Sequence, residues 1–145
     1  MKKLVLHIIL PIFVGSVIYV LFREKTLLMF DWFSYLKLDF IIDSLRNNFY
    51  RYRIYIPKSI LFSLPDALWV YSFTMFLSIY FKNRILLSII FIGSIITEIL
   101  QLWFVIGTFD IYDVVYMFAL YLVAMYFIKK FEEEKKLWKR KRDWF

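Results

Sequence analysis

Cysteine is absent from the 145-residue sequence, histidine occurs once, and glycine and proline occur three times each. The absence of cysteine excludes disulfides, thiol chemistry and thiolate metal sites. With His7 as the single histidine, most metal sites and histidine-based catalytic schemes are excluded as well. The 17 phenylalanines and 11 tyrosines are not typical of a disordered or low-complexity chain. We therefore expect a folded protein with no metal and no cofactor.

Hydrophobic residues make up 62% of the chain and aromatic residues 23%, and the mean hydropathy is +0.65. These values argue against a soluble globular domain. In a membrane protein, the net charge of +7 is first a signal of topology and of contact with lipid, and only second one of nucleic-acid binding. The composition therefore predicts one membrane domain over residues 1–145, with membrane lipids as partners and no nucleic-acid partner.

Four apolar segments are each long enough to cross a hydrocarbon core of ~30 Å at ~1.5 Å per residue. The first segment ends at Arg23, Glu24 and Lys25 and has no small-residue cleavage site, so we expect a retained span rather than a signal peptide. The predicted fold is all-α and polytopic, with an interfacial helical and extended segment between the first and second spans. The four predicted transmembrane helices cover about 4–22, 59–81, 85–106 and 110–128.

The segment between the first two predicted spans is too polar to cross a membrane and too apolar to be a free linker. Within residues 28–49, apolar residues recur at helical spacing, which predicts one or two short helices lying in the membrane interface. Within residues 50–56, cationic and aromatic residues alternate at the start, which favours an extended strip. Such a strip is typical of an interfacial belt, and Arg51 and Arg53 between aromatic rings would also suit sugars or phosphates.

Several aspartates have an explanation that requires no function. The sequence Ser63-Leu-Pro-Asp66 fits a helix start that is capped by Ser63, and it equally fits a mid-helix proline that leaves Asp66 in a cavity. Asp110 and Asp113 fall in the first turn of the fourth predicted span, where carboxylates complement exposed backbone amides. Capping alone would therefore account for all three residues.

Residues 129–145 form a charged tail after the last predicted span. Glu132 and Lys136 pair at i, i+4 in the favourable order, which predicts that the last helix continues beyond the membrane. The basic residues 139–142, next to Trp138, resemble a contact with anionic lipid. The tail is therefore predicted to be a basic, helical, cytoplasmic extension.

Four spans place both termini on the same side of the membrane. Lys2, Lys3, the turn 82–84 and the basic tail fall on that side, whereas the short turn 107–109 on the other side has no cation. The positive-inside rule therefore places both termini in the cytoplasm. The cations of the first loop, residues 23–58, are an exception, because this loop lies on the outer side. The assignment rests on the N-terminus, the turn 82–84 and the basic tail.

Glu98 and Gln101 lie near the outer end of the third predicted span, among apolar residues. Residues three apart share a helix face, so both side chains point the same way. An ionisable group inside a membrane segment costs about 2.5–3.5 kcal/mol on insertion scales, which makes Glu98 a candidate functional residue. The orientation places three aspartates at the same outer end. The predicted ligand-binding pocket has Glu98 and Gln101 at its base, Asp66, Asp110 and Asp113 on its walls, and Arg51 and Arg53 as a lid.

These residues resemble a motif of the VanZ-like family of bacterial membrane proteins. In that family, a Glu-x-x-Gln helix like Glu98–Gln101 is followed by a loop and an Asp-containing helix start, here 109–113. Asp66 matches an earlier Asp-containing span, and the resemblance covers roughly residues 63–124. It implies a multi-pass protein of the bacterial cytoplasmic (inner) membrane and the cell envelope. In the family's named member it implies resistance to glycopeptide antibiotics such as teicoplanin.

Three functions fit these features. The first is a VanZ-like envelope protein whose outward acidic pocket binds a lipid headgroup, a lipid-linked envelope precursor or a glycopeptide antibiotic. The second is a small accessory subunit whose aromatic surfaces and Glu98 pack against a membrane protein partner. The third is an enzyme acting on a lipid-linked substrate through paired carboxylates. The enzyme ranks last, because the sequence contains no nucleophile–base pair and no phosphate loop, and no catalytic residue is assigned.

Overall fold

The computed structural model describes residues 2–25, 28–104 and 110–142, and every regular element in these ranges is a helix, as predicted. The order of elements is α1 (Lys2–Phe22), α2 (Leu28–Tyr35), α3 (Asp39–Phe49), the 3₁₀ helix η1 (Tyr50–Tyr55), α4 (Lys58–Leu77), α5 (Arg84–Phe104) and α6 (Ile111–Arg142).

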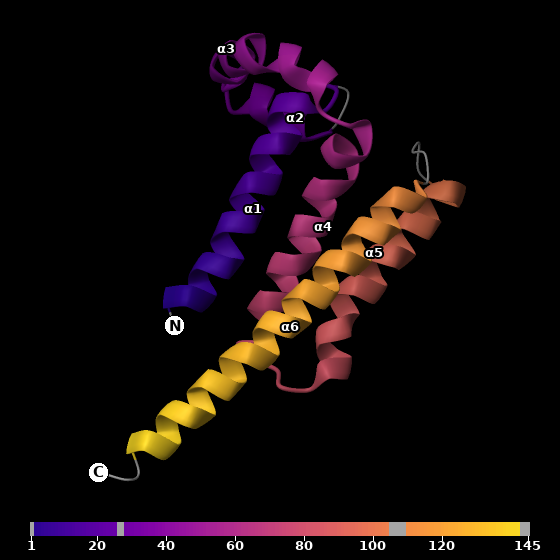
Figure 1. Ribbon diagram of the computed structural model, residues 1–145. Coiled ribbons are helices and arrows are strands. Elements are labelled where there is room, and N and C mark those ends of the chain that lie inside the picture. The colour runs from indigo at the N-terminus through magenta and orange to yellow at the C-terminus, as the bar shows by residue number, and fades with distance from the viewer. Residues whose placement is uncertain (1, 26–27, 105–109, 143–145) are drawn as a thin grey trace.

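Four long helices form the body of the molecule, and the short ones cover one end of it. In Figure 1, α1 and α5 run in one direction and α4 and α6 in the other, so the chain begins and finishes at the same end. Helix α4 is central and makes its most extensive contacts with α6 and α1, while α5 packs on α4 and α6. The short helices α2, α3 and η1 lie at the end far from the termini, next to the end of α1.

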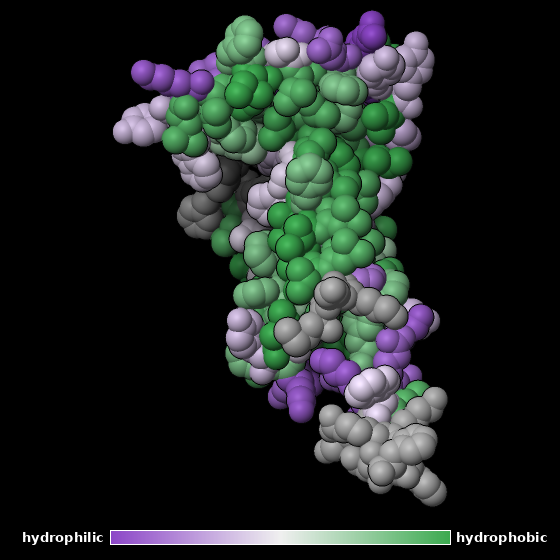
Figure 2. All heavy atoms as spheres, turned by 90° about the vertical axis from the view of Figure 1, so that its left-hand side faces the viewer, coloured by the Kyte–Doolittle hydropathy of each residue, from purple (hydrophilic) through white to green (hydrophobic). Residues whose placement is uncertain are grey.

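Three helices of the described chain are long and apolar enough to cross a membrane. They cover Leu4–Phe22, Lys58–Leu77 and Ile111–Trp138. Figure 2 shows the corresponding surface, in which a broad hydrophobic band separates hydrophilic residues at the two ends. The structure therefore supports three of the four predicted spans. The remaining predicted span lies on α5.

Helix α4 carries most of the core, because small and apolar side chains on it meet α1, α5 and α6. One buried cluster joins Tyr71 and Met75 of α4 to Leu87, Ala124 and Ile128. A second cluster joins two further α4 residues to Met117 of α6. Buried Ser63, Ser72 and Thr74 also lie on α4, and small residues of this kind allow helices in membranes to approach closely.

Helices α1 and α4 lie close together at Gly15. A Cβ atom added to Gly15 would lie 3.1 Å from the Trp69 ring and 3.2 Å from the carbonyl oxygen of Pro65. Only a residue without a side chain fits this contact without movement of a neighbour. Gly15 therefore fixes the depth at which α1 packs beside the proline of α4.

Pro65 lies inside α4 and is fully buried, so the interpretation of Ser63–Asp66 as a helix start is wrong. The helix begins at Lys58, directly after Pro57. A proline within a helix offers no N–H to the carbonyl four residues earlier and pushes that carbonyl away. Capping therefore does not explain Asp66.

The extended strip predicted for residues 50–56 is also wrong, because Tyr50–Tyr55 form the 3₁₀ helix η1. In a 3₁₀ helix, side chains three apart lie above one another. Accordingly, Arg53 donates a hydrogen bond to the Tyr50 hydroxyl and its guanidinium lies 5.4 Å from the Tyr50 ring centre. These contacts between i and i+3 favour the helix over the alternating strip. The two short interfacial helices expected before it correspond to α2 and α3.

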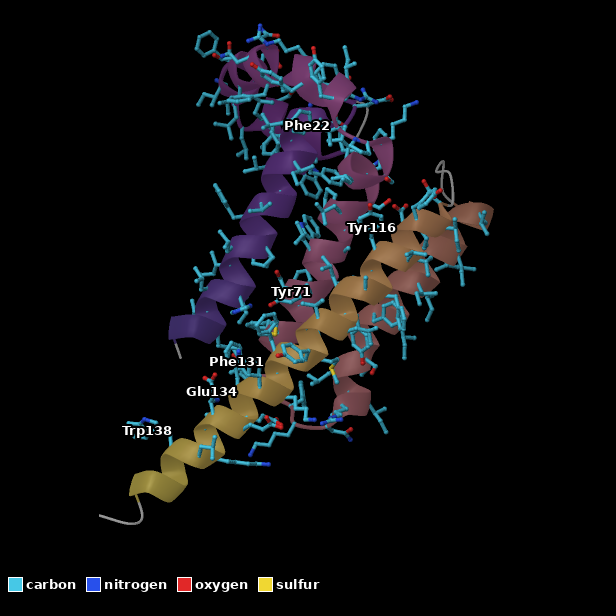
Figure 3. The ribbon with its side chains drawn as sticks, in the orientation of Figure 1. Phe22, Tyr71, Tyr116, Phe131, Glu134 and Trp138 are labelled. Carbon is cyan, nitrogen blue, oxygen red and sulfur yellow. The ribbon has the colours of Figure 1, made fainter. Side chains whose placement is uncertain are left out.

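In the half of the bundle near the termini, His7 of α1 and Tyr71 of α4 form a hydrogen bond. The His7 ring lies 4.6 Å from the Phe127 ring and 5.3 Å from the Phe131 ring of α6, measured between ring centres. Figure 3 places Tyr71 and Phe131 in this half of the molecule. The pair thus joins α1 and α4 within an aromatic environment.

Candidate functional site

Four charged residues of the long helices and their ends lie together at the end of the bundle far from the termini. Arg23 directly follows α1, Asp66 lies in the first half of α4, Glu98 in the last turns of α5, and Asp113 in the first turn of α6 (Figure 1). Because neighbouring long helices are antiparallel, these four positions fall at the same end of the bundle. We call these four residues the acid–arginine cluster.

Arg23 ties the end of α1 to the proline region of α4. Its Nη2 atom lies 3.6 Å from Oδ2 of Asp66 and donates a hydrogen bond of 3.1 Å to the carbonyl oxygen of Phe62. The guanidinium also lies 5.0 Å from the ring centre of Tyr19 and 4.8 Å from that of Phe62. Phe62 lies three residues before Pro65, so Arg23 contacts the same stretch of α4 that contains the proline.

Glu98 is buried, with 8% of its surface exposed, and its Oε1 atom has no hydrogen-bond partner among the described residues. Its carboxyl interacts with the side chain of Asp113 and with the backbone of Asp110. The Oδ1 atom of Asp113 is likewise buried and without a partner in the described part of the chain. A buried polar atom without a hydrogen-bond partner is costly, so these two oxygens are able to accept a hydrogen bond from a donor group.

The charges of the cluster do not balance. Asp66, Glu98 and Asp113 interact electrostatically with one another, and Arg23 is the one cation that interacts with them among the described residues. Three carboxyl groups beside one guanidinium favour a further cation or hydrogen-bond donor. No group of three potential metal ligands in the described residues is placed to hold a metal ion.

Asp110 has a structural role at the start of α6. Its Oδ1 atom accepts a hydrogen bond of 2.9 Å from the backbone N–H of Tyr112, which is the contact of a helix cap. Asp113 makes no such bond among the described residues, and its side chain interacts with Glu98 instead. Capping therefore explains Asp110 but not Asp113.

The predicted lid residues lie in η1 and have other partners. Arg51 donates a hydrogen bond of 3.2 Å to the Tyr52 hydroxyl. Arg53 lies 4.0 Å from Glu24 and stacks on the rings of Tyr50 and Phe62. Neither arginine contacts Asp66, Glu98 or Asp113 within the described residues. The side chain of Gln101 lies outside the described part of the structure.

Arg23 is the member of the acid–arginine cluster that the sequence does not single out, and Tyr19, whose ring its guanidinium contacts, is not singled out either. From the sequence alone, Arg23 is predicted only to end the first span. A signal was present, because Tyr19 and Arg23 are four residues apart and therefore share a helix face. Arg23 is also the first cation at the outer end of an apolar span, next to a predicted group of acids.

A comparison of the chain with protein-family models, curated proteins and solved structures finds no match. The class of the protein therefore follows from the structure: an all-helical protein with three helices able to cross a membrane and an acidic cluster at one end.

Proposed function

We propose that the chain is a VanZ-like integral membrane protein of the bacterial cell envelope. Its acid–arginine cluster binds the polar part of a lipid headgroup, a lipid-linked envelope precursor or a glycopeptide antibiotic, in a role related to resistance. The observation that carries the proposal is the buried Glu98, whose Oε1 atom lacks a partner in the described chain. A carboxyl group in this position is retained at a cost to stability, which is typical of a binding residue.

The proposed topology has four spans with both termini in the cytoplasm of the bacterial inner membrane. Helix α5, at 21 residues, is ~31 Å long and reaches across a hydrocarbon core of ~30 Å. The termini lie at the same end of the molecule as the connection between α4 and α5, which carries Lys82 and is followed by Arg84, the first residue of α5. These cations support placing that end inside. The acid–arginine cluster then faces outward, where envelope lipids and antibiotics approach.

The excess of carboxyl groups favours a ligand that donates hydrogen bonds. Ammonium and hydroxyl groups are the donors that buried carboxylates accept most readily. Amino groups and sugars occur in lipid-linked envelope precursors and glycopeptides, and an amino group occurs in some lipid headgroups. The acid–arginine cluster is thus suited to the amine or hydroxyl part of such a molecule.

Binding of a fluorescent lipid-linked precursor, and separately of a fluorescent glycopeptide, to the full chain in nanodiscs tests this proposal. Glu98→Gln keeps the size of the side chain and removes its charge. A lost charged hydrogen bond of about 1.5–3 kcal/mol corresponds to a Kd about 10- to 150-fold higher. Asp110→Asn is the matched control, because asparagine also caps helices and should leave the Kd unchanged.

Thermal unfolding separates a loss of binding from a loss of folding. Glu98→Gln removes a buried charge that lies beside the Asp113 carboxyl, so we expect an unchanged or higher Tm. Equal binding of both ligands by the wild type and Glu98→Gln would refute the proposed site.

A second candidate function is that of a small accessory subunit in a membrane complex. Helix α5 favours it, because a row of large side chains on this helix is exposed in the single chain, including Ile89, Ile92 and Ile96. Such a face contacts either lipid or another membrane helix. Purification in a mild detergent distinguishes the two: a stoichiometric companion protein supports the subunit, and a lone monomer or homo-oligomer supports the binding protein.

A further inference from the structure

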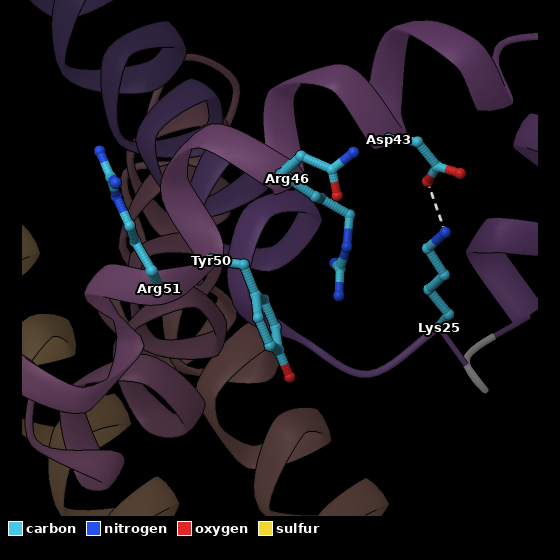
Figure 4. A pocket seen from close by; sticks show the side chains of 6 residues that line it. Lys25, Asp43, Arg46, Tyr50 and Arg51 are labelled. Atoms are coloured by element: carbon cyan, nitrogen blue, oxygen red, sulfur yellow. Dashed lines mark hydrogen bonds and ion pairs between the residues drawn. The ribbon is translucent and has the colours of Figure 1, made fainter.

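A second polar site, opposite in charge to the acid–arginine cluster, lies under the short helices. It is a hollow of about 410 Å³ between α3, η1 and the connection that follows α1, shown in Figure 4. The residues that line this basic pocket are Lys25, Asp43, Arg46, Asn47, Tyr50 and Arg51. None of them belongs to the acid–arginine cluster.

Arg46 is the residue of the basic pocket whose side chain is held in place by contacts with the core. It is 7% exposed, and its Nη1 atom donates a hydrogen bond of 2.6 Å to the carbonyl oxygen of Val20 in α1. Its guanidinium lies 5.1 Å from the Phe30 ring centre and 5.0 Å from that of Tyr50. A guanidinium has five N–H donors in its plane, and aromatic rings occupy its faces rather than its edge. The edge of Arg46 is therefore pre-positioned to bind an anion.

The remaining residues add positive charge and donors. Lys25 pairs with Asp43, and both side chains of this pair are about half exposed, so the contact can open. Asn47 and Tyr50 are the neutral residues of the lining. In the view of Figure 4, Arg51 extends to the other side of Tyr50 from Lys25. Three cations and one carboxylate line the pocket, which leaves an excess of positive charge.

The position of the basic pocket matches the depth of lipid headgroups. It lies at the end of the α1 span, and α3 lies across that end of the molecule. Helix α3 turns Ile42 and Arg46 inward and leaves Phe40, Ile41 and Leu45 exposed. An interfacial helix buries its apolar side chains in the headgroup and acyl boundary, next to the phosphates of the lipids.

We propose that the basic pocket binds a phosphate group, with Arg46 and Lys25 as its principal donors. Arginine binds phosphate through two parallel N–H···O bonds, and lysine binds it as a point charge. The phosphate takes the place of Asp43 as the partner of Lys25. The source of the phosphate is either an anionic phospholipid headgroup or a phosphate-containing ligand from solution.

Equilibrium binding to the full chain in neutral detergent micelles tests this inference. The probes are short-chain phosphatidylglycerol with a fluorescent label, the equivalent phosphatidylcholine, and unlabelled inorganic pyrophosphate as a competitor. The wild type is expected to prefer phosphatidylglycerol, because a basic residue near anionic lipid contributes about 1 kcal/mol, or about fivefold in Kd. Displacement by pyrophosphate indicates a site for phosphate itself, whereas resistance to displacement indicates a site for the lipid headgroup.

Variants that change the affinity for phosphatidylglycerol in opposite directions make the test specific to the basic pocket. Lys25→Gln should weaken phosphatidylglycerol binding about fivefold, and Asp43→Asn should strengthen it by a similar factor, because it removes the competing carboxylate. Lys58→Gln removes an exposed cation outside the pocket and should change the Kd less than twofold. These three variants leave Arg46 and its contacts with the core in place, so they should fold.

Two results would overturn the inference: equal affinity for the two lipids, or equal weakening by Lys25→Gln and Lys58→Gln. The site is independent of the proposed function. Glu98→Gln should leave the binding of phosphatidylglycerol unchanged, so failure at one site is distinguishable from failure at the other.

Discussion

The contact between Arg23 and Asp66 gives the most direct test of how the end of α1 is attached to α4. At 3.6 Å, the gross Coulomb attraction of the pair is about 4–5 kcal/mol for an effective dielectric constant of about 20. The side chains are 24% and 40% exposed, so screening and desolvation reduce the net value well below this figure. The hydrogen bond to Phe62 and the two ring contacts of Arg23 add to it.

Arg23→Met keeps much of the side-chain length and removes the charge and the donors. We expect it to lower the free energy of unfolding by about 2–3 kcal/mol, from the lost charged hydrogen bond and the carboxyl group left without its cation. The measurement is reversible unfolding in mixed detergent micelles, followed by circular dichroism. Lys25→Met is the control, because the pair of Lys25 and Asp43 is more exposed and should contribute less than about 1 kcal/mol.

A double-mutant cycle separates the ion pair from the other contacts of Arg23. Asp66→Asn alone and in combination with Arg23→Met should reveal a coupling energy of about 1–2 kcal/mol. The reasoning is refuted if Arg23→Met costs no more than Lys25→Met, or if the two substitutions at the α1–α4 contact are additive. In either case, the ion pair would not be what holds the two helices together.

Three further predictions concern the rest of the bundle, each measured by thermal unfolding. Gly15→Ala should cost about 1–3 kcal/mol, because the new Cβ meets α4 at 3.1–3.2 Å, whereas Gly93→Ala, with no described atom within 4 Å, should be neutral or stabilising. Asp110→Ala should cost about 1 kcal/mol through loss of the cap of α6, and Asp110→Asn should cost less. His7→Phe and Tyr71→Phe should each cost about 1–3 kcal/mol by leaving a polar partner unpaired, and the double variant should cost less than their sum. Additive losses would contradict the His7–Tyr71 bond.

The helical class and the positions of the long helices were predictable, because apolar length alone determines which segments can cross a membrane. The short helices α2 and α3 followed from the period of their apolar residues. The error at η1 has a physical origin. Tyrosine and arginine each have an apolar stem and a polar tip, so an alternation of the two does not define a polar and an apolar face.

The sequence predicted that Asp66, Glu98 and Asp113 lie at the same end of the bundle, because this depends only on the direction of each span. Their cation was not predictable, since the partner of Asp66 depends on the rotation of α1 against α4. The small space between Gly15 and the carbonyl of Pro65 restricts that rotation, and no periodic pattern reveals it. Pro65 was ambiguous for the same reason: the sequence around it satisfies both a helix start and a helix interior.

The acid–arginine cluster and the basic pocket lie at the end of the molecule far from the termini. The first has an excess of acidic residues and the second an excess of basic residues. The two sites share no residue, but Arg53 links them. Its guanidinium stacks on Tyr50, which lines the basic pocket, and on Phe62, whose ring also contacts Arg23 of the acid–arginine cluster. A ligand with an amine or sugar and a phosphate would engage both sites, whereas two separate ligands would engage one each. Glu98→Gln and Lys25→Gln distinguish these cases. If one molecule occupies both sites, each variant weakens the binding of the same probe, and if two molecules do, each variant affects its own probe alone.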